Sequence, residues 1–264
     1  MTSANGQARV SIAASSSNLR TEGRIYLASY DMERFSGKVE AYKIKADSHK
    51  LDTLPAWTTS TTLDADSLNW SSRRILSHSG TNGITFNWTS LSAEQQSALR
   101  GPDTDAAGTK RVDFLRGERS NERPVGTLRQ RTSRMGTIVN SNLWTVAAPR
   151  RLAFEHKGHF DFRSARVTRP ETVYIGANGG MLHAFDAATG SERFAYVPLA
   201  AYPGLRDYTS PQYTHRLFVD GHPFTGDADI SWVSGNTDPA PSPKWRTVLV
   251  SGLGGGGRGF FVLD

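Results

Sequence analysis

Residues 172–196 read TVYIGANGGMLHAFDAATGSERFAY, and this stretch decides the fold. The run 173–175 is β-branched and aromatic, as residues on a pleated, half-buried surface tend to be, and it stops at the glycine-rich turn 176–180. In the next run, 181–185, alternate residues share a face, and the turn 186–190 leads into a third run, 193–197. Strand, turn, strand, turn and strand together predict an antiparallel meander.

Two turns and one histidine within this stretch carry more specific predictions. Asn178-Gly179 is a pair that accepts positive φ at both centres of a type I′ turn, so we expect it at the tip of the first hairpin. Asp186 opens the second turn. His183 lies in the middle of a strand, and we interpret it as a core histidine with one hydrogen bond rather than as a catalytic group.

The same pattern occurs twice more, in residues 24–44 and 246–264. Each contains an apolar run, a glycine-containing turn and an alternating run. Such units cannot bury their apolar face alone, so they stack into a solenoid, a propeller or an array. The spacings between them are unequal and longer than the roughly 40 to 50 residues of a usual blade, which favours a propeller with insertions.

We therefore expect an all-β fold, a partial and insertion-bearing β-propeller of the quinoprotein-like type. Residues 1–23 are expected to be a flexible or edge segment, and residues 24–264 an incomplete propeller domain, truncated because the sequence stops directly after a strand. Tryptophans in the first gap between repeats are expected to fill the core or the space between blades; they are Trp57, Trp70 and Trp88.

The sequence predicts one short insertion helix. Ser92 and Gln95 form a capping-box pattern, and Gly101-Pro102 ends the helix that follows it. The segment 101–110 has the composition of a loop.

Composition excludes few functions. The 264 residues contain no cysteine, so disulfides, thiolate metal sites and cysteine nucleophiles are absent from the chain. The N-terminus shows no apolar run that would indicate a signal peptide, and no stretch approaches the roughly 18 to 20 apolar residues needed to cross a bilayer. The net charge of +6 permits attraction to nucleic acid, acidic glycans or anionic lipid without selecting among them.

Arginines are concentrated between residues 110 and 134. We expect a solvated, Arg-rich loop with local ion pairs. It is also the candidate contact for a polyanion or a partner, through Arg111, Arg116, Arg119, Arg123, Arg129, Arg131 and Arg134. Only Phe114 interleaves with these charges, so a stacking platform for bases, and with it specific nucleic-acid binding, is not supported.

Other clusters of polar residues are weak candidates for chemistry. His156, His159 and Asp161 offer three potential metal ligands in a turn, and aspartate pairs at 103/105 and 227/229 resemble the start of a calcium loop without its later ligands. The glycine run 252–259 leads into a strand and lacks the lysine of a phosphate-binding loop. We expect no catalytic, cofactor or metal site in this chain.

Several segments, in order along the chain, resemble the PilC/PilY family of type IV pilus proteins. The segments are 35–42 (FSGKVEAY), 112–117 (VDFLRG), 134–141 (RMGTIVNS), 173–186 (VYIGANGGMLHAFD), 213–221 (YTHRLFVDG) and 245–259. The sequence departs from the family pattern at four positions. Thr137 and Asn140 replace an aspartate and a histidine, Leu143 stands near the usual proline, and Gly179 replaces an aspartate.

The resemblance implies a secreted protein at the pilus tip or outer surface that supports pilus assembly and extension, adhesion and twitching motility, without being an enzyme. Implied partners are minor pilins, host or abiotic surfaces and the remainder of its own propeller. The family's calcium loop is expected C-terminal to residue 264.

Two alternatives stay open at this point. The phrase 175–190 also occurs in the blades of pyrroloquinoline quinone dehydrogenases, although no aspartate or tryptophan constellation here can be assigned to a quinone. The Arg-rich stretch alternatively indicates a basic module that binds nucleic acid or acidic glycan.

Overall fold

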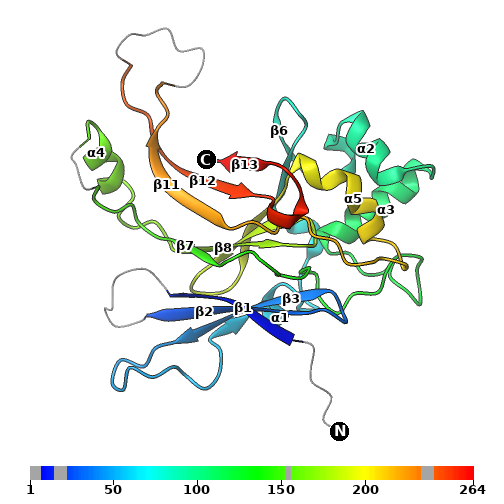
Figure 1. Cartoon of the computed structure of the whole chain (residues 1–264), viewed down its shortest axis with the longest axis horizontal. Coiled ribbons are helices and arrows are strands. Elements are labelled where there is room, and N and C mark those ends of the chain that lie inside the picture. Colours follow the sequence, from blue (N-terminus) through cyan, green and yellow to red (C-terminus); the bar gives the residue numbers. More distant parts are fainter. Residues whose placement is uncertain (1–6, 15–22, 153–155, 233–240) are drawn as a thin grey trace.

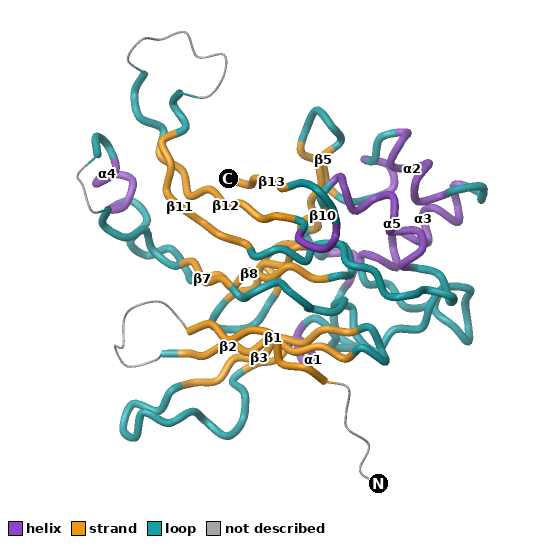
Figure 2. The backbone as a smooth tube through the Cα atoms, in the orientation of Figure 1, coloured by secondary structure: helices purple, strands orange, loops and turns teal. Residues whose placement is uncertain are grey.

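The computed structural model describes residues 7–14, 23–152, 156–232 and 241–264. These residues form three β-sheets that lie one after another, with a group of helices on one side (Figures 1 and 2). The sheets do not close into a ring, as expected for a partial propeller. Among the described residues, no helix combines the length and apolar character that a bilayer crossing needs.

The first sheet has four antiparallel strands in the order of the chain. They are β1 (Gln7–Ala14), β2 (Arg24–Asp31), β3 (Ser36–Lys43) and β4 (Trp57–Thr58). The strand β1 is the edge strand and pairs with β2 along its length. The expected domain boundary at residue 24 therefore falls between two paired strands, and the first blade includes residues 7–14. Residues 1–6 and 15–22 lie outside the described part.

The second sheet contains the meander predicted from residues 172–196. It is formed by β7 (Trp144–Val146), β8 (Thr172–Ala177), β9 (Met181–Asp186) and β10 (Glu192–Val197). A hairpin of β5 (Ile75–His78) and β6 (Gly83–Thr85) extends it, with β5 parallel to β10. Most side chains of β8 and β9 are buried on both faces, because other elements cover both sides of this central sheet.

The type I′ turn predicted for Asn178-Gly179 is wrong. The loop between β8 and β9 has three residues, and only Gly180 has positive φ, at 92°. Loops of this length commonly place a glycine in the left-handed region at their last position. Asn178 instead has a buried side chain that binds other segments. The Asp186 turn is confirmed, since the Asp186 carboxylate accepts hydrogen bonds from the backbone of residues 188 and 189.

The third sheet is formed by β11 (Pro223–Asp229), β12 (Trp245–Gly252) and β13 (Phe260–Leu263). The three predicted repeats are the hairpins β2–β3, β8–β9 and β12–β13, which are the second and third strands of their sheets. The glycine run between β12 and β13 is a turn containing the 3-10 helix η4 (Gly254–Gly256), as predicted.

The helices are α1 (Thr59–Thr62), α2 (Ala93–Arg100), α3 (Asp105–Arg116), α4 (His159–Ser164) and α5 (Tyr202–Tyr208), with 3-10 helices η1 (Trp70–Ser72), η2 (Trp88–Ser90) and η3 (Leu199–Ala201). The capping box of α2 is confirmed in both directions. The loop predicted for 101–110 is wrong from residue 105, where α3 begins. Thr104 caps α3 through its side chain, and Asp105 lies in the first turn, where the helix dipole favours an acid.

Two buried clusters hold the sheets together. One lies between the first and second sheets, where the Trp57 ring packs 5.9 Å from Tyr26 and 6.4 Å from Phe185. The other joins the second sheet to the helices and to the third sheet. Trp57 is therefore a filler between blades, as predicted. Trp70 and Trp88 are only partly buried, and Trp88 packs against the second cluster.

Candidate functional site

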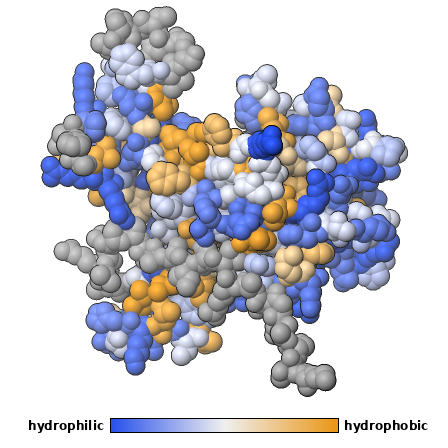
Figure 3. Space-filling model, viewed as in Figure 1, coloured by the Kyte–Doolittle hydropathy of each residue, from blue (hydrophilic) through white to orange (hydrophobic). Residues whose placement is uncertain are grey.

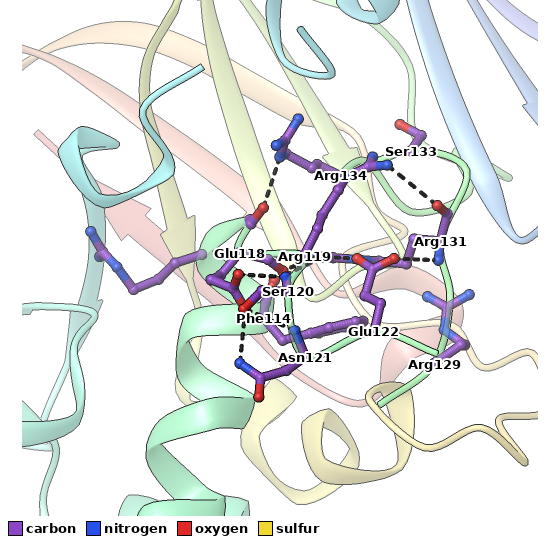
Figure 4. Close-up of polar contacts among 12 residues, drawn as sticks. Phe114, Glu118, Arg119, Ser120, Asn121, Glu122, Arg129, Arg131, Ser133 and Arg134 are labelled. Carbon is purple, nitrogen blue, oxygen red and sulfur yellow. Dashed lines mark hydrogen bonds and ion pairs between the residues drawn. The ribbon is translucent and has the colours of Figure 1, made fainter. Parts of the chain in front are cut away.

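Arg131, near the end of the Arg-rich segment, is buried rather than solvated. Figure 4 shows the polar contacts around it. Its guanidinium donates to Glu122 Oε1 at 2.8 Å and to the Phe114 carbonyl at 2.7 Å, and it lies 3.5 Å from the centroid of the Phe114 ring. Burial lowers the pKa of Arg131 to about 10 although Glu122 opposes the shift, so the side chain stays cationic at neutral pH. This arginine stabilises the loop after α3.

The neighbouring arginines also bind this chain's own backbone. Arg116 donates to the Phe86 carbonyl, and Arg129 to the Tyr208 carbonyl. Further bonds join Arg134 to the carbonyl oxygens of residues 63 and 117, Arg111 to those of residues 99 and 100, and Arg119 to Asp64 and the carbonyl of residue 131.

The prediction of a solvated loop is therefore wrong, because long guanidinium side chains here satisfy buried carbonyl groups. The predicted local ion pairs are present, between Arg131 and Glu122 and between Arg111 and Asp103. Among the candidate contact residues, Arg123 is exposed, Arg111, Arg119 and Arg134 are half-buried, and Arg116, Arg129 and Arg131 are buried.

A second buried ionic group lies at β9 and β10. Arg73 donates to both carboxylate oxygens of Glu192 at 2.7 and 2.9 Å, and His183 Nδ1 lies 2.8 Å from Glu192 Oε1. Burial raises the pKa of the Glu192 carboxyl, but Arg73 and His183 outweigh it, and the pKa falls to about 2. The predicted role of His183, packed in the core with one hydrogen bond, is confirmed.

The residues considered as metal ligands do not form the groups that the sequence suggested. His159 Nε2 lies 3.2 Å from Asp227 Oδ2, while His156 packs against the Trp245 ring. Asp103 pairs with Arg111, and Asp105 with Arg100. Within the described ranges, no three His, Cys, Asp or Glu side chains are grouped as a metal site would need.

A polar junction that sequence reasoning missed lies between the second and third sheets. Asp220 accepts hydrogen bonds from the Asn140 backbone N–H at 3.0 Å, from Asn140 Nδ2 at 2.6 Å and from Asn178 Nδ2 at 3.2 Å. It is 1% exposed, so its carboxylate is satisfied by the Asn140 and Asn178 side chains and the Asn140 backbone N–H. Thr137 binds His215 in the same region, at 2.7 Å.

The signal that could have found this junction was the resemblance itself. Its segments 134–141, 173–186 and 213–221 are the three that meet at Asp220. Two of the departures from the family pattern, Thr137 and Asn140, bind directly across the junction. A third departure, Gly179, lies against Gly136, where the two backbones approach too closely for a side chain on Gly136.

Beyond the junction, two surface features remain available for binding. A cleft of about 460 Å³ lies between β7 and β11. The outer face of the third sheet is apolar, with Phe224 at 57%, Val250 at 39% and Val262 at 51% exposure directly opposite one another and Phe260 at 75% beside them. Figure 3 shows hydrophobic surface gathered over this sheet, next to the C-terminal strand.

The chain is similar to known proteins along most of its length. Residues 135–264 match the model of the PilY1 beta-propeller domain. The chain is 36% identical over 248 residues to type IV pilus biogenesis factor PilY1 of Pseudomonas aeruginosa (strain PAK), which covers 88% of this chain and 20% of that protein. It is 34% identical over 260 residues to a PilY1 homolog of Xylella fastidiosa (strain Temecula1 / ATCC 700964), covering 96% of this chain and 19% of the homolog.

No solved structure matches the chain. The chain spans about a fifth of the length of these curated relatives. The matching domain model, the relatives and the three blade-like sheets agree, and the chain belongs to the PilY1 family of type IV pilus biogenesis factors, within its β-propeller region.

Proposed function

We propose that this chain is a non-enzymatic part of a type IV pilus tip protein, exposed at the cell surface, which supports pilus assembly and extension, adhesion and twitching motility. The observation that carries the proposal, beside family membership, is the apolar outer face of the third sheet. Contiguous exposed apolar surface on a soluble protein marks a place where another polypeptide packs.

The proposed occupants of this face belong to the pilus apparatus. The curated relatives are about five times as long as this chain, so the remainder of the propeller is the first candidate to cover β11, β12 and β13. Minor pilins are the second candidate, and they would bind surfaces that the completed propeller leaves exposed.

A binding role rather than an enzymatic one is supported by the buried titratable groups. The carboxylate of Glu192 is held by Arg73 and His183, and that of Asp227 by His159 and Thr247. The hydrogen-bonding groups of both carboxylates are thus occupied by side chains of this chain. We therefore expect no dye reduction by the protein when pyrroloquinoline quinone, calcium and an alcohol are supplied, and such activity would overturn this part of the proposal.

The test uses the encoding bacterium. Deleting the gene should remove surface pili and twitching, measured by shearing pilin from cells and by the diameter of motility zones, and the full-length gene should restore both. A gene carrying Phe260→Asp and Val262→Asp should fail to restore them, whereas Arg258→Asp, an exposed position in the neighbouring turn, should succeed. Normal piliation in the deletion strain would refute the pilus role.

A further inference from the structure

The second and third sheets are held side by side along matching segments and then separate. Residues near 137–144 contact residues near 215–225 at a nearly constant spacing, through the Thr137–His215 and Asn140–Asp220 bonds and a bond from the Asn142 backbone N–H to His222. The last contact is Trp144, whose Nε1 donates to Thr225 Oγ1 at 2.8 Å. Beyond it, the two segments of the chain diverge toward the side of the molecule that carries α4 (Figures 1 and 2).

The space that opens there is the 460 Å³ cleft, with the strand edges of β7 and β11 on its two sides. Within the described residues, β7 pairs only with β8, and β11 only with β12. The Ile230 N–H donates to the Lys244 carbonyl, so in the antiparallel pattern residues 224, 226 and 228 bond to β12. The backbone groups of Thr225 and Asp227 are then turned toward the cleft.

The walls of the cleft combine apolar area with positive charge. The Trp144 and Phe224 rings line it and lie in tilted contact, with their centroids 4.9 Å apart. Arg150, which lines the cleft, is exposed and has no acidic partner in the described part of the chain. Arg169 also lines it and donates to the Ala147 carbonyl and to Thr247 Oγ1. The single carboxylate that lines the cleft belongs to Asp227, which His159 and Thr247 already bind.

We propose that the cleft between β7 and β11 binds an extended, acidic polypeptide segment of a partner protein, which adds as a strand to the edge of β11. Unpaired strand edges supply backbone donors and acceptors at regular spacing, and an added strand uses them while its side chains occupy alternate positions. Arg150 selects acidic side chains, the charge of Arg169 adds to the positive potential, and the Trp144–Phe224 pair contacts an apolar side chain. This inference does not depend on the pilus role.

The test is fluorescence anisotropy with the whole chain and three labelled six-residue peptides. The first alternates valine and glutamate, the second valine and lysine, and the third is the acidic peptide with alternate backbone nitrogens methylated. The acidic peptide should bind saturably, the lysine peptide should not, and methylation should abolish binding because the backbone can no longer pair.

Two variants locate the site. Arg150→Glu should weaken binding of the acidic peptide about fivefold, as reversing one exposed charge does, while Arg258→Glu, an exposed arginine outside the cleft, should leave it unchanged. Failure of the acidic peptide to bind, equal binding of the methylated or lysine peptide, or equal effects of the two variants would each overturn the proposal. Circular dichroism of both variants confirms that they fold.

Discussion

The two faces of the central sheet are joined to their neighbours in different ways. Toward the first sheet the contact is dry and aromatic, with Trp57, Tyr26 and Phe185 fully packed. Toward the third sheet a buried hydrophobic cluster is joined by a polar junction at Asp220, and the contact then opens into a cleft. The first interface is sealed by hydrophobic burial, whereas the second combines hydrophobic burial with hydrogen bonds and leaves strand edges available for binding.

The largest effect should follow from breaking the sealed interface. Trp57→Ala removes a side chain that is 5% exposed, together with its Nε1 hydrogen bond to the Ala187 carbonyl, and should lower the free energy of unfolding by about 3 to 5 kcal/mol. Urea denaturation measures this loss. Trp70→Ala, at a partly exposed site, is the control and should cost less than about 1 kcal/mol. Equal losses for both would mean that the first sheet is not sealed by Trp57.

The next effect is a pH dependence that arises from Glu192 on β10. Its pKa is about 2 when folded and ordinarily 4.5, so its contribution is fully present above pH 4.5 and is lost as the pH falls toward 2. A shift of this size corresponds to about 3 kcal/mol. The wild type should therefore be more stable than Glu192→Gln above pH 4.5, and the difference in their free energies of unfolding should shrink as the pH falls toward 2. Urea denaturation at several pH values measures this difference. Glu33→Gln, at an exposed position, should track the wild type throughout.

The polar junction should be weaker than the aromatic seal. Asp220→Ala leaves the donors of Asn140 and Asn178 without their acceptor, and should cost about 2 to 3 kcal/mol. Hydrogen exchange should also rise selectively in residues 217–222, next to the third sheet. The exposed Asp47→Ala serves as the control and should alter neither measurement. Exchange that rises first in the first sheet would contradict the distinction between the two interfaces.

Sequence alone predicted the parts of the fold that depend on local periodicity. The meander 172–196 and its two repeats follow from alternation and turn residues, and the α2 capping box from a four-residue pattern. The start of α3 was missed because Thr104 and Asp105 are as common in loops as at helix N-termini.

The candidate site was less predictable, because its contacts join residues far apart in the chain. Arg116 binds a carbonyl 30 residues away, and Asn140 binds Asp220 across 80 residues. A run of arginines normally indicates a solvated surface, and nothing local shows that distant backbone carbonyls accept these side chains. The cleft likewise forms where the segments 137–144 and 215–225, which are far apart in the sequence, touch at one end and then diverge.

The smallest predicted effect is the difference in stability loss when the same substitution, tryptophan to phenylalanine, is made at each of the two interfaces. Trp144→Phe keeps a ring against Phe224 but removes the Nε1 bond to Thr225, and Trp57→Phe removes the bond to Ala187. A neutral hydrogen bond contributes about 1 kcal/mol, and less of this is lost at Trp144 because water in the open cleft can replace the lost donor. The buried Ala187 carbonyl would keep only the long 3.4 Å hydrogen bond that it accepts from the Tyr26 hydroxyl. Urea denaturation should therefore rank Trp57→Phe as the more destabilising change. The reverse ranking would show that the β7–β11 side is sealed, and the strand-accepting cleft would then have no room for a ligand.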